Sequence, residues 1–314
     1  MTFGFVFPGQ GSQSVGMLAA LAPGGGAEPA IRDTFAEASA VLGYDLRQLV
    51  AQGPAERLNS TECTQPAMLA ASVATWRLWR ARGGGEPLVV CGHSLGEFSA
   101  LVAAGALDFA AALDLVRFRG QAMQEAVPAG TGAMAAILGL EDAQVIAACR
   151  EAAQGGVVEA VNFNAPGQVV IAGAREPVER AIEAAKRRGA KRAVALPVSV
   201  PSHSSLMRSA AQRLAERLAA VEFRAPRIRF VSAVDASPHE DPADLRRLLV
   251  KQLSSPVLWS DTVRALAASG VRSLIECGPG KVLTALNRRI ERALQSLALE
   301  DAESLTAALA AVQA

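Results

Sequence analysis

The chain reads Pro87-Leu88-Val89-Val90-Cys91-Gly92-His93-Ser94-Leu95-Gly96 over residues 87–96. Residues 87–91 form a continuous apolar run, which is typical of a strand buried on both faces of a parallel sheet. The next five residues fit the pattern G-x-S-x-G, and residues 95–104 have the apolar spacing of a helix. A serine in a tight turn between strand and helix exposes its hydroxyl. The stretch predicts an α/β domain with Ser94 as nucleophile; a chance match in a glycine-rich chain is the alternative.

Strand and helix patterns alternate on both sides of this turn. Apolar runs predict further strands, and periodic apolar spacing predicts further helices. The strands are expected at 3–7, 228–232 and 273–276, and the helices at 27–49, 66–82, 108–125, 204–221, 242–253, 260–269 and after 280. Such alternation indicates a parallel sheet covered by helices on both faces.

The pattern changes between residues 128 and 198. Strands are expected at 133–138, 156–161, 168–172 and 191–196, and helices at 142–153 and 176–188. The order β-α-β-β-α-β is that of a ferredoxin-like unit. We therefore expect a ferredoxin-like subdomain at 128–198, inserted into a catalytic domain made of residues 1–127 and 199–314.

Composition excludes several classes of protein. The chain has 31 Lys and Arg against 30 Asp and Glu, without the basic surplus of a nucleic-acid-binding protein. Its four cysteines are far apart and form no C-x-x-C pair, which argues against a zinc site or a disulfide framework. Residues 1–8 lack a basic leader pattern, and no window offers roughly 18 uninterrupted apolar residues. We expect a cytoplasmic protein that binds no metal, nucleic acid or membrane.

A serine nucleophile needs a base, and the chain has three histidines. His93 directly precedes Ser94, so its side chain leaves the turn in another direction. His239 lies in a polar loop. His203 lies between the expected subdomain and a helix, a natural position for the wall of a cleft. Elimination favours His203 as the base, with a structural histidine as the alternative.

A series of segments, in one order along nearly the whole chain, resembles the malonyl-CoA:acyl carrier protein transacylases of bacterial fatty acid synthesis. The segments are residues 5–13, 92–97, 119–124, 161–164, 200–203, 252–257 and 276–281. The resemblance implies an α/β-hydrolase-like domain with a ferredoxin-like subdomain, in line with the insertion expected above. It also implies transfer of a malonyl group from malonyl-CoA to the phosphopantetheine thiol of an acyl carrier protein, through a malonyl-serine.

The resemblance assigns the reacting groups at matching positions. Ser94 resembles the acylated nucleophile, and His203 its base. Gln10 and the Leu95 backbone N–H resemble an oxyanion hole, and an N–H at a helix start suits that role. Arg119 resembles the group that pairs with the malonyl carboxylate, which a planar guanidinium can bind through two hydrogen bonds.

The remaining implied roles concern orientation and binding. A backbone carbonyl near Gln252 takes the place of the acid of a catalytic triad, so Asp235 receives no role. Gln252 and Asn162 are implied substrate-binding residues. Ser202 stands where many malonyl-selective polyketide acyltransferase domains carry Phe, which leaves the rejection of larger malonyl groups open. No cofactor is implied.

Other interpretations remain. A serine esterase or thioesterase of the α/β-hydrolase kind would need a late histidine, and none follows His239. A non-catalytic carrier-binding subunit would not need the full set of reactive residues. Malonyl transfer could also serve polyketide assembly or malonate decarboxylation. The expected carrier partner is acidic and binds transiently. Its candidate docking residues, or else a solvated helix face, are Lys186, Arg187, Arg188, Lys191, Arg192, Arg288 and Arg289.

Overall fold

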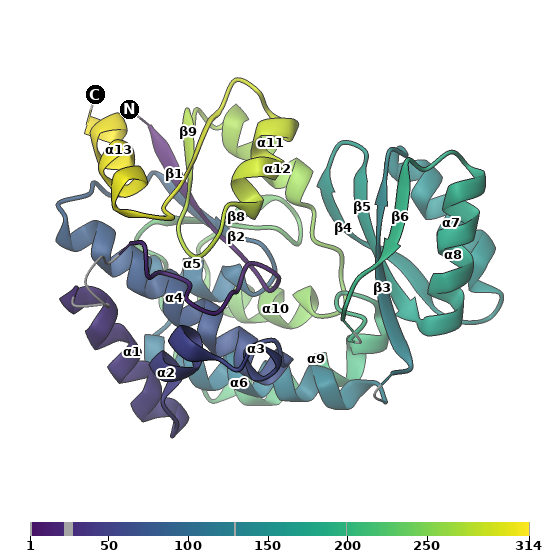
Figure 1. The fold of residues 1–314 in the computed structure, drawn as a ribbon, viewed down its shortest axis with the longest axis horizontal. Helices are drawn as coiled ribbons and strands as arrows, with labels where there is room; N and C mark the ends of the chain where they lie inside the picture. Colours follow the sequence, from purple (N-terminus) through teal and green to yellow (C-terminus); the bar gives the residue numbers. More distant parts are fainter. Residues whose placement is uncertain (1, 22–27, 129, 199, 314) are drawn as a thin grey trace.

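The computed structural model describes residues 2–21, 28–128, 130–198 and 200–313. The chain forms a large lobe and a small lobe side by side (Figure 1). The large lobe holds a six-stranded sheet in the order β10-β9-β1-β2-β7-β8. Its strands are β1 (Phe3–Phe7), β2 (Val89–Gly92), β7 (Arg229–Ser232), β8 (Ser237–His239), β9 (Ser273–Glu276) and β10 (Gln295–Ala298). Neighbouring strands are parallel except for β7 and β8, which are antiparallel.

Helices cover both faces of this sheet. They are α1 (Pro29–Leu42), α2 (Leu46–Gln52), α3 (Ala55–Leu58), α4 (Thr61–Ala81), α5 (Gly96–Ala103), α6 (Phe109–Ala126), α9 (Arg208–Ala219), α10 (Pro242–Gln252), α11 (Trp259–Ala268), α12 (Val282–Ile290) and α13 (Ala302–Gln313). Strand β1 is apolar throughout because each of its two faces packs into a hydrophobic core. Phe5 and Phe7 pack into the larger core with α4 and α5, whereas Val6 faces the core formed with α11 and α12.

The small lobe is a four-stranded antiparallel sheet in the order β4-β5-β3-β6. Its elements are β3 (Gly132–Leu138), α7 (Asp142–Ala153), β4 (Val158–Ala165), β5 (Gln168–Ala174), α8 (Arg175–Arg187) and β6 (Arg192–Ala195). Both helices lie on the same face of the sheet (Figure 1). The predicted fold class, an α/β domain with a parallel sheet and a separate ferredoxin-like unit, is confirmed.

Several element boundaries differ from the sequence predictions. The helix expected over 27–49, whose first residue lies outside the described residues, is two helices. Gly43 ends α1 with a φ of 76°, and the Asp45 side chain caps α2. The strand expected at 156–161 runs instead from Val158 to Ala165, so residues 162–165 also belong to β4. Helix α4 begins at Thr61, ahead of Pro66. Among the described residues, none of the helices has the length and apolarity needed to cross a bilayer.

Candidate active site

The turn between β2 and α5 holds Ser94 in a left-handed backbone conformation, with a φ of 53°. Two close approaches explain the glycines around it. A Cβ on Gly92 would lie 1.9 Å from the carbonyl carbon of Gly96, and one on Gly96 would lie 2.0 Å from the carbonyl oxygen of Phe7. Only glycine fits at either position. The pattern thus builds the tight turn, packs it against the end of β1 and exposes the serine hydroxyl.

His203 connects Ser94 to the end of α10. Its Nε2 lies 2.7 Å from Ser94 Oγ, and its Nδ1 lies 2.8 Å from the backbone oxygen of Gln252. Because a carbonyl can only accept, Nδ1 carries the proton and Nε2 is free to accept the serine proton. Burial, together with the nearby Arg119 charge, lowers the pKa of His203 to about 3. The imidazole is therefore neutral near pH 7, as a general base must be.

The other two histidines have separate partners. His93 Nε2 lies 2.8 Å from Asn164 Oδ1, and its ring packs against Trp259. His239 Nε2 lies 3.1 Å from the Asp235 carboxylate. Neither histidine bonds to Ser94, and Asp235 pairs with His239 and not with His203. The backbone carbonyl of residue 252 occupies the place that an acid takes in other triads.

Two donors line the same cavity as the nucleophile. The Leu95 N–H is at the start of α5, and in the part of the chain that the structure describes no group accepts a hydrogen bond from it. Gln10 follows β1 in an exposed turn and lines the same cavity as Ser94. A Cβ on Gly9 would lie 2.6 Å from the His93 carbonyl oxygen, so glycine allows the two turns to approach. Both donors can face a developing oxyanion.

Arg119 extends from α6 to the nucleophile and is 2 % exposed. Its Nη2 donates to Ser94 Oγ at 3.2 Å and to Gln252 Oε1 at 3.0 Å, and its Nη1 donates to Gln65 Oε1 at 2.9 Å. Its Nε is buried and has no acceptor among the described residues. Burial lowers the pKa of Arg119 to about 10, so the group stays charged at neutral pH. A cation with neutral partners beside a nucleophile can bind an anionic acyl group.

The two residues with implied binding roles lie in different places. Asn162 is on β4 and lines the cavity, and its Oδ1 is buried with no donor among the described residues. The side chain of Gln252 is 1 % exposed, and its Nε2 donates to the Ser94 backbone oxygen at 2.9 Å. It therefore packs behind the nucleophile and does not line the cavity.

Ser94, His203 and Arg119 line a cavity of about 700 Å³ between the lobes. Its far wall is apolar and comes from the small lobe, through Met134, Val170 and Leu196. Polar residues of the α3–α4 region, including Asn59 and Ser60, lie on the large-lobe side. The volume is in the range of small-molecule and cofactor sites. Within the described ranges, no three His, Cys, Asp or Glu side chains are placed to hold a metal ion.

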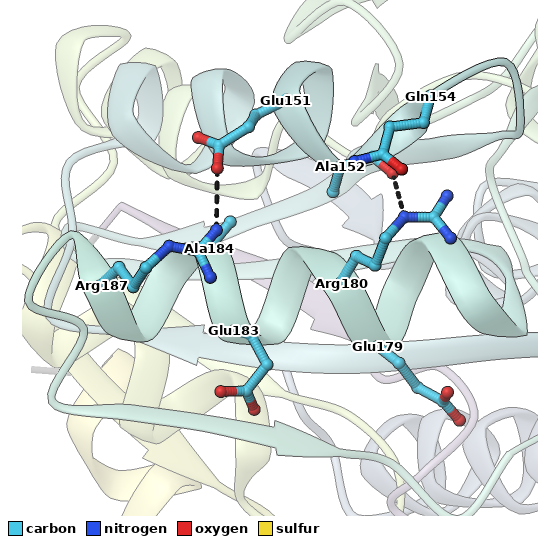
Figure 2. Close-up of a pocket in the computed structure, with 8 residues that line it drawn as sticks. All are labelled: Glu151, Ala152, Gln154, Glu179, Arg180, Glu183, Ala184 and Arg187. Carbon is cyan, nitrogen blue, oxygen red and sulfur yellow. Dashed lines mark hydrogen bonds and ion pairs between the residues drawn. The ribbon is translucent and has the colours of Figure 1, made fainter.

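A second hollow, of about 370 Å³, lies between α7 and α8 (Figure 2). Its charged groups other than Glu179 have local partners. Arg187 pairs with Glu151, and Arg180 donates to the Ala152 carbonyl at the end of α7. Lys186 likewise pairs with Glu183. For Lys186 and Arg187, these contacts favour a solvated helix face over a docking site for the carrier protein.

Two buried polar residues of the site were missed by the sequence analysis. Gln65, at 0 % exposure, accepts from Arg119, and Glu97, also at 0 %, accepts from Gln252 Nε2 at 2.6 Å. A signal for Glu97 was present, because it is the one charged residue in the apolar helix 95–104. Nothing in the local pattern around Gln65 indicates its contact with α6.

A serine–histidine pair on an α/β lobe, with a ferredoxin-like lobe across the cleft, fits an acyltransferase of the serine type. The comparisons agree, because residues 4–309 match the family described as acyl transferase domain. The chain is 57 % identical, over 98 % of both chains, to the malonyl CoA-acyl carrier protein transacylase of Salmonella typhimurium. The chain belongs to this transacylase family.

Solved structures show the same relationship. An acyl carrier protein S-malonyltransferase from Vibrio cholerae matches with a TM-score of 0.95 and 56 % identity, over 98 % of this chain and 100 % of the other. A malonyl-transacylase solved in complex with a type II PKS acyl-carrier protein matches with a TM-score of 0.97 and 54 % identity, over 99 % and 100 %. The similarity therefore extends through both lobes.

Proposed function

We propose that this chain moves a malonyl group from malonyl-CoA to the phosphopantetheine thiol of an acyl carrier protein, for fatty acid synthesis, by way of a malonyl-serine. One observation carries the proposal: the Ser94 hydroxyl lies 2.7 Å from a neutral imidazole nitrogen and 3.2 Å from a buried guanidinium nitrogen. The first contact activates the nucleophile, and the second places a cation where the free carboxylate of a malonyl group can reach. The activities named for the relatives support the same reaction.

In the first half-reaction, Ser94 Oγ attacks the thioester carbonyl while its proton passes to His203 Nε2. Oγ–C bond formation places a negative charge on the carbonyl oxygen, which the Leu95 N–H and Gln10 stabilise. The tetrahedral intermediate collapses, the C–S bond breaks, and His203 returns the proton to the leaving thiolate of coenzyme A. Nδ1, held on the residue 252 carbonyl, keeps the imidazole in the required tautomer.

In the second half-reaction, the carrier thiol gives its proton to His203 and attacks the malonyl-serine carbonyl. The C–Oγ bond then breaks and Ser94 recovers the proton. Arg119 holds the malonyl carboxylate in both halves, and Asn162 contacts substrate with its unpartnered amide oxygen. These steps use side chains and backbone donors alone, so they call for no metal or organic cofactor.

The proposal extends to organisation and location. We assign residues 1–127 and 199–314 to the catalytic domain and 128–198 to the ferredoxin-like subdomain. The partners are malonyl-CoA and an acidic acyl carrier protein. The structure of a similar malonyl-transacylase in complex with an acyl-carrier protein supports the second partner. We place the protein in the cytoplasm, which suits four buried cysteines that remain thiols.

The test is acylation of the intact protein by malonyl-CoA, followed by mass spectrometry. Wild type should gain one malonyl group, and Ser94→Ala should gain none. Ser99→Ala is the matched control, because Ser99 is a buried serine in α5, the helix that follows the Ser94 turn. A stable malonyl adduct on Ser94→Ala would overturn the assignment. Transfer of the label to added carrier protein, without release of free malonate, separates a transferase from a hydrolase.

A further inference from the structure

Glu97 is a buried carboxylate placed directly behind the nucleophile. Its Oε1 accepts from the Ala233 N–H at 2.6 Å and from Ser232 Oγ at 2.9 Å, and its Oε2 accepts from Gln252 Nε2 at 2.6 Å. Burial raises the pKa of Glu97 to about 7, but all three hydrogen bonds are donated to the carboxylate and favour its ionised form. Glu97 is therefore anchored to β7 and its following turn on one side and to the Gln252 amide on the other.

The Gln252 side chain connects Glu97 to the reacting groups. Its Nε2 also donates to the Ser94 backbone oxygen at 2.9 Å, and its Oε1 accepts from Arg119 Nη2 at 3.0 Å. A glutamine amide has two orientations that differ by exchange of its oxygen and nitrogen. A carboxylate at 2.6 Å accepts only from the NH₂ group. Glu97 thus selects the orientation in which the amide oxygen faces Arg119.

We propose that Glu97 is a positioning residue that gives the site its selectivity for a carboxylate-bearing acyl group, by fixing the Gln252 amide that holds Arg119. The inference rests on the proposed function. With the amide reversed, its NH₂ would face the Arg119 donor and its oxygen would face the Ser94 carbonyl. Both contacts are repulsive, so Arg119 would leave the position in which it reaches Ser94 Oγ.

The spacing of the charges supports this role. None of the carboxylates in the described residues forms an ion pair with Arg119, whose partners are Gln65, Ser94 and Gln252. A direct Glu–Arg pair would neutralise the guanidinium and compete with a substrate carboxylate. With one neutral amide between them, Glu97 orients Arg119 and favours its charged form while leaving it free to bind an anion.

Glu97→Gln tests the inference, because it keeps the shape and removes two acceptor sites. Its amide must turn NH₂ either toward Gln252 or toward the Ala233 N–H, and each choice creates a buried clash of donors. The measurement is kcat/KM for acylation of Ser94 by malonyl-CoA and by acetyl-CoA. We expect the malonyl-to-acetyl ratio to fall by about tenfold or more, mainly through KM for malonyl-CoA. A general loss of folded enzyme would lower both rates equally and leave the ratio unchanged.

Glu276→Gln is the matched control. Glu276 is also 0 % exposed and accepts two backbone hydrogen bonds, from Leu283 and Thr284, but it bonds to none of the site residues. Its variant should keep the wild-type ratio. A Glu97→Gln protein with the wild-type ratio would overturn the inference.

A second variant keeps the test decisive if Glu97→Gln does not fold. Gln252→Leu retains the backbone carbonyl that orients His203 and removes only the amide. It should lose the same selectivity, and Glu97→Gln should add no further loss in the double variant. An unchanged ratio in Gln252→Leu would overturn the inference. Absence of any malonyl-serine in wild type would instead overturn the proposed function itself, and with it the role of Glu97.

Discussion

Arg119 acts on two groups at once. It donates to Ser94 Oγ, and its charge contributes to the low pKa of His203. A malonyl carboxylate bound to Arg119 would offset that charge, so the base would become stronger when the correct acyl group is present. An acetyl group brings no such charge. If Arg119 binds the malonyl carboxylate as proposed, it would link recognition of the substrate to the strength of the base.

Replacement of Arg119 by alanine should remove the preference for malonyl over acetyl. We expect kcat/KM for malonyl-CoA to fall by about 100-fold, in keeping with the loss of charged hydrogen bonds, and acetyl-CoA to change far less. Arg117→Ala is the control, since Arg117 lies on the same helix and pairs with Asp114 away from the cavity. Stopped-flow acylation with both donors measures the ratio, and an unaltered ratio would exclude Arg119 as the carboxylate ligand.

Among single residues, the sequence predicts those whose role depends on a local pattern. Ser94 follows from its strand, its glycines and its helix, and His203 from the small number of histidines. Glu97 and Gln65 act through partners 155 and 54 residues away. Such contacts depend on how α4, α5, α6 and α10 pack together, which no local pattern records.

The turn between β2 and α5 is the element on which the site depends most. Gly96→Ala would push a methyl group against the Phe7 carbonyl, so we expect a loss of stability of about 1–3 kcal/mol or more and loss of acylation. Gly85→Ala is the control, because its Cβ would meet nothing closer than 3.8 Å. Thermal unfolding and the malonyl adduct are the measurements. Full activity in Gly96→Ala would show that the turn can relax without moving Ser94.

Glu276, the last residue of β9, accepts hydrogen bonds from the first N–H groups of α12 and should make stability depend on pH. Burial raises its pKa from 4.5 to about 7, although two backbone N–H groups favour the charged form. The unfolded state loses this proton first as pH rises, so the cost to the folded state grows across pH 4.5 to 7 and reaches roughly 3 kcal/mol. Glu276→Gln removes this dependence. In denaturant unfolding, the free energy of unfolding of Glu276→Gln relative to wild type should increase from pH 4.5 to 7. A difference that stays constant over this range would refute the raised pKa.

Sequence patterns were least informative for the shortest and outermost elements. The strands β8 and β10 lie at the two edges of the large sheet, and α3 has four residues. Ser237–His239 is an edge strand that is only partly buried, so it can be polar. It therefore lacks the apolar run that identified β1 and β2. The central strands were predictable since burial on both faces demands apolar residues throughout.

Several hydrogen bonds join the two lobes. The backbone of Val257 exchanges hydrogen bonds with Val161 and Phe163 of β4, at 2.8 and 2.9 Å. Arg289 of α12 donates to Pro166 and Gln168 at the β4–β5 turn. The apolar cavity wall and Asn162 belong to the small lobe, whereas Ser94, His203 and Arg119 belong to the large one. The geometry of the substrate site therefore depends on the relative position of the lobes.

The bond between His93 and Asn164 offers a way to test that dependence, because it joins the nucleophile turn directly to β4. Asn164→Ala would leave the His93 Nε2–H buried without an acceptor, so we expect a loss of about 1–3 kcal/mol in stability.

The same change would also loosen the small-lobe wall of the cavity, so KM should rise for malonyl-CoA and acetyl-CoA alike. The ratio of the two KM values should stay constant, unlike the effect of changes at Arg119. His239→Ala removes a histidine bond within the large lobe and should affect stability alone. Unchanged KM values in a destabilised Asn164→Ala enzyme would show that this bond stabilises the fold without shaping the cavity.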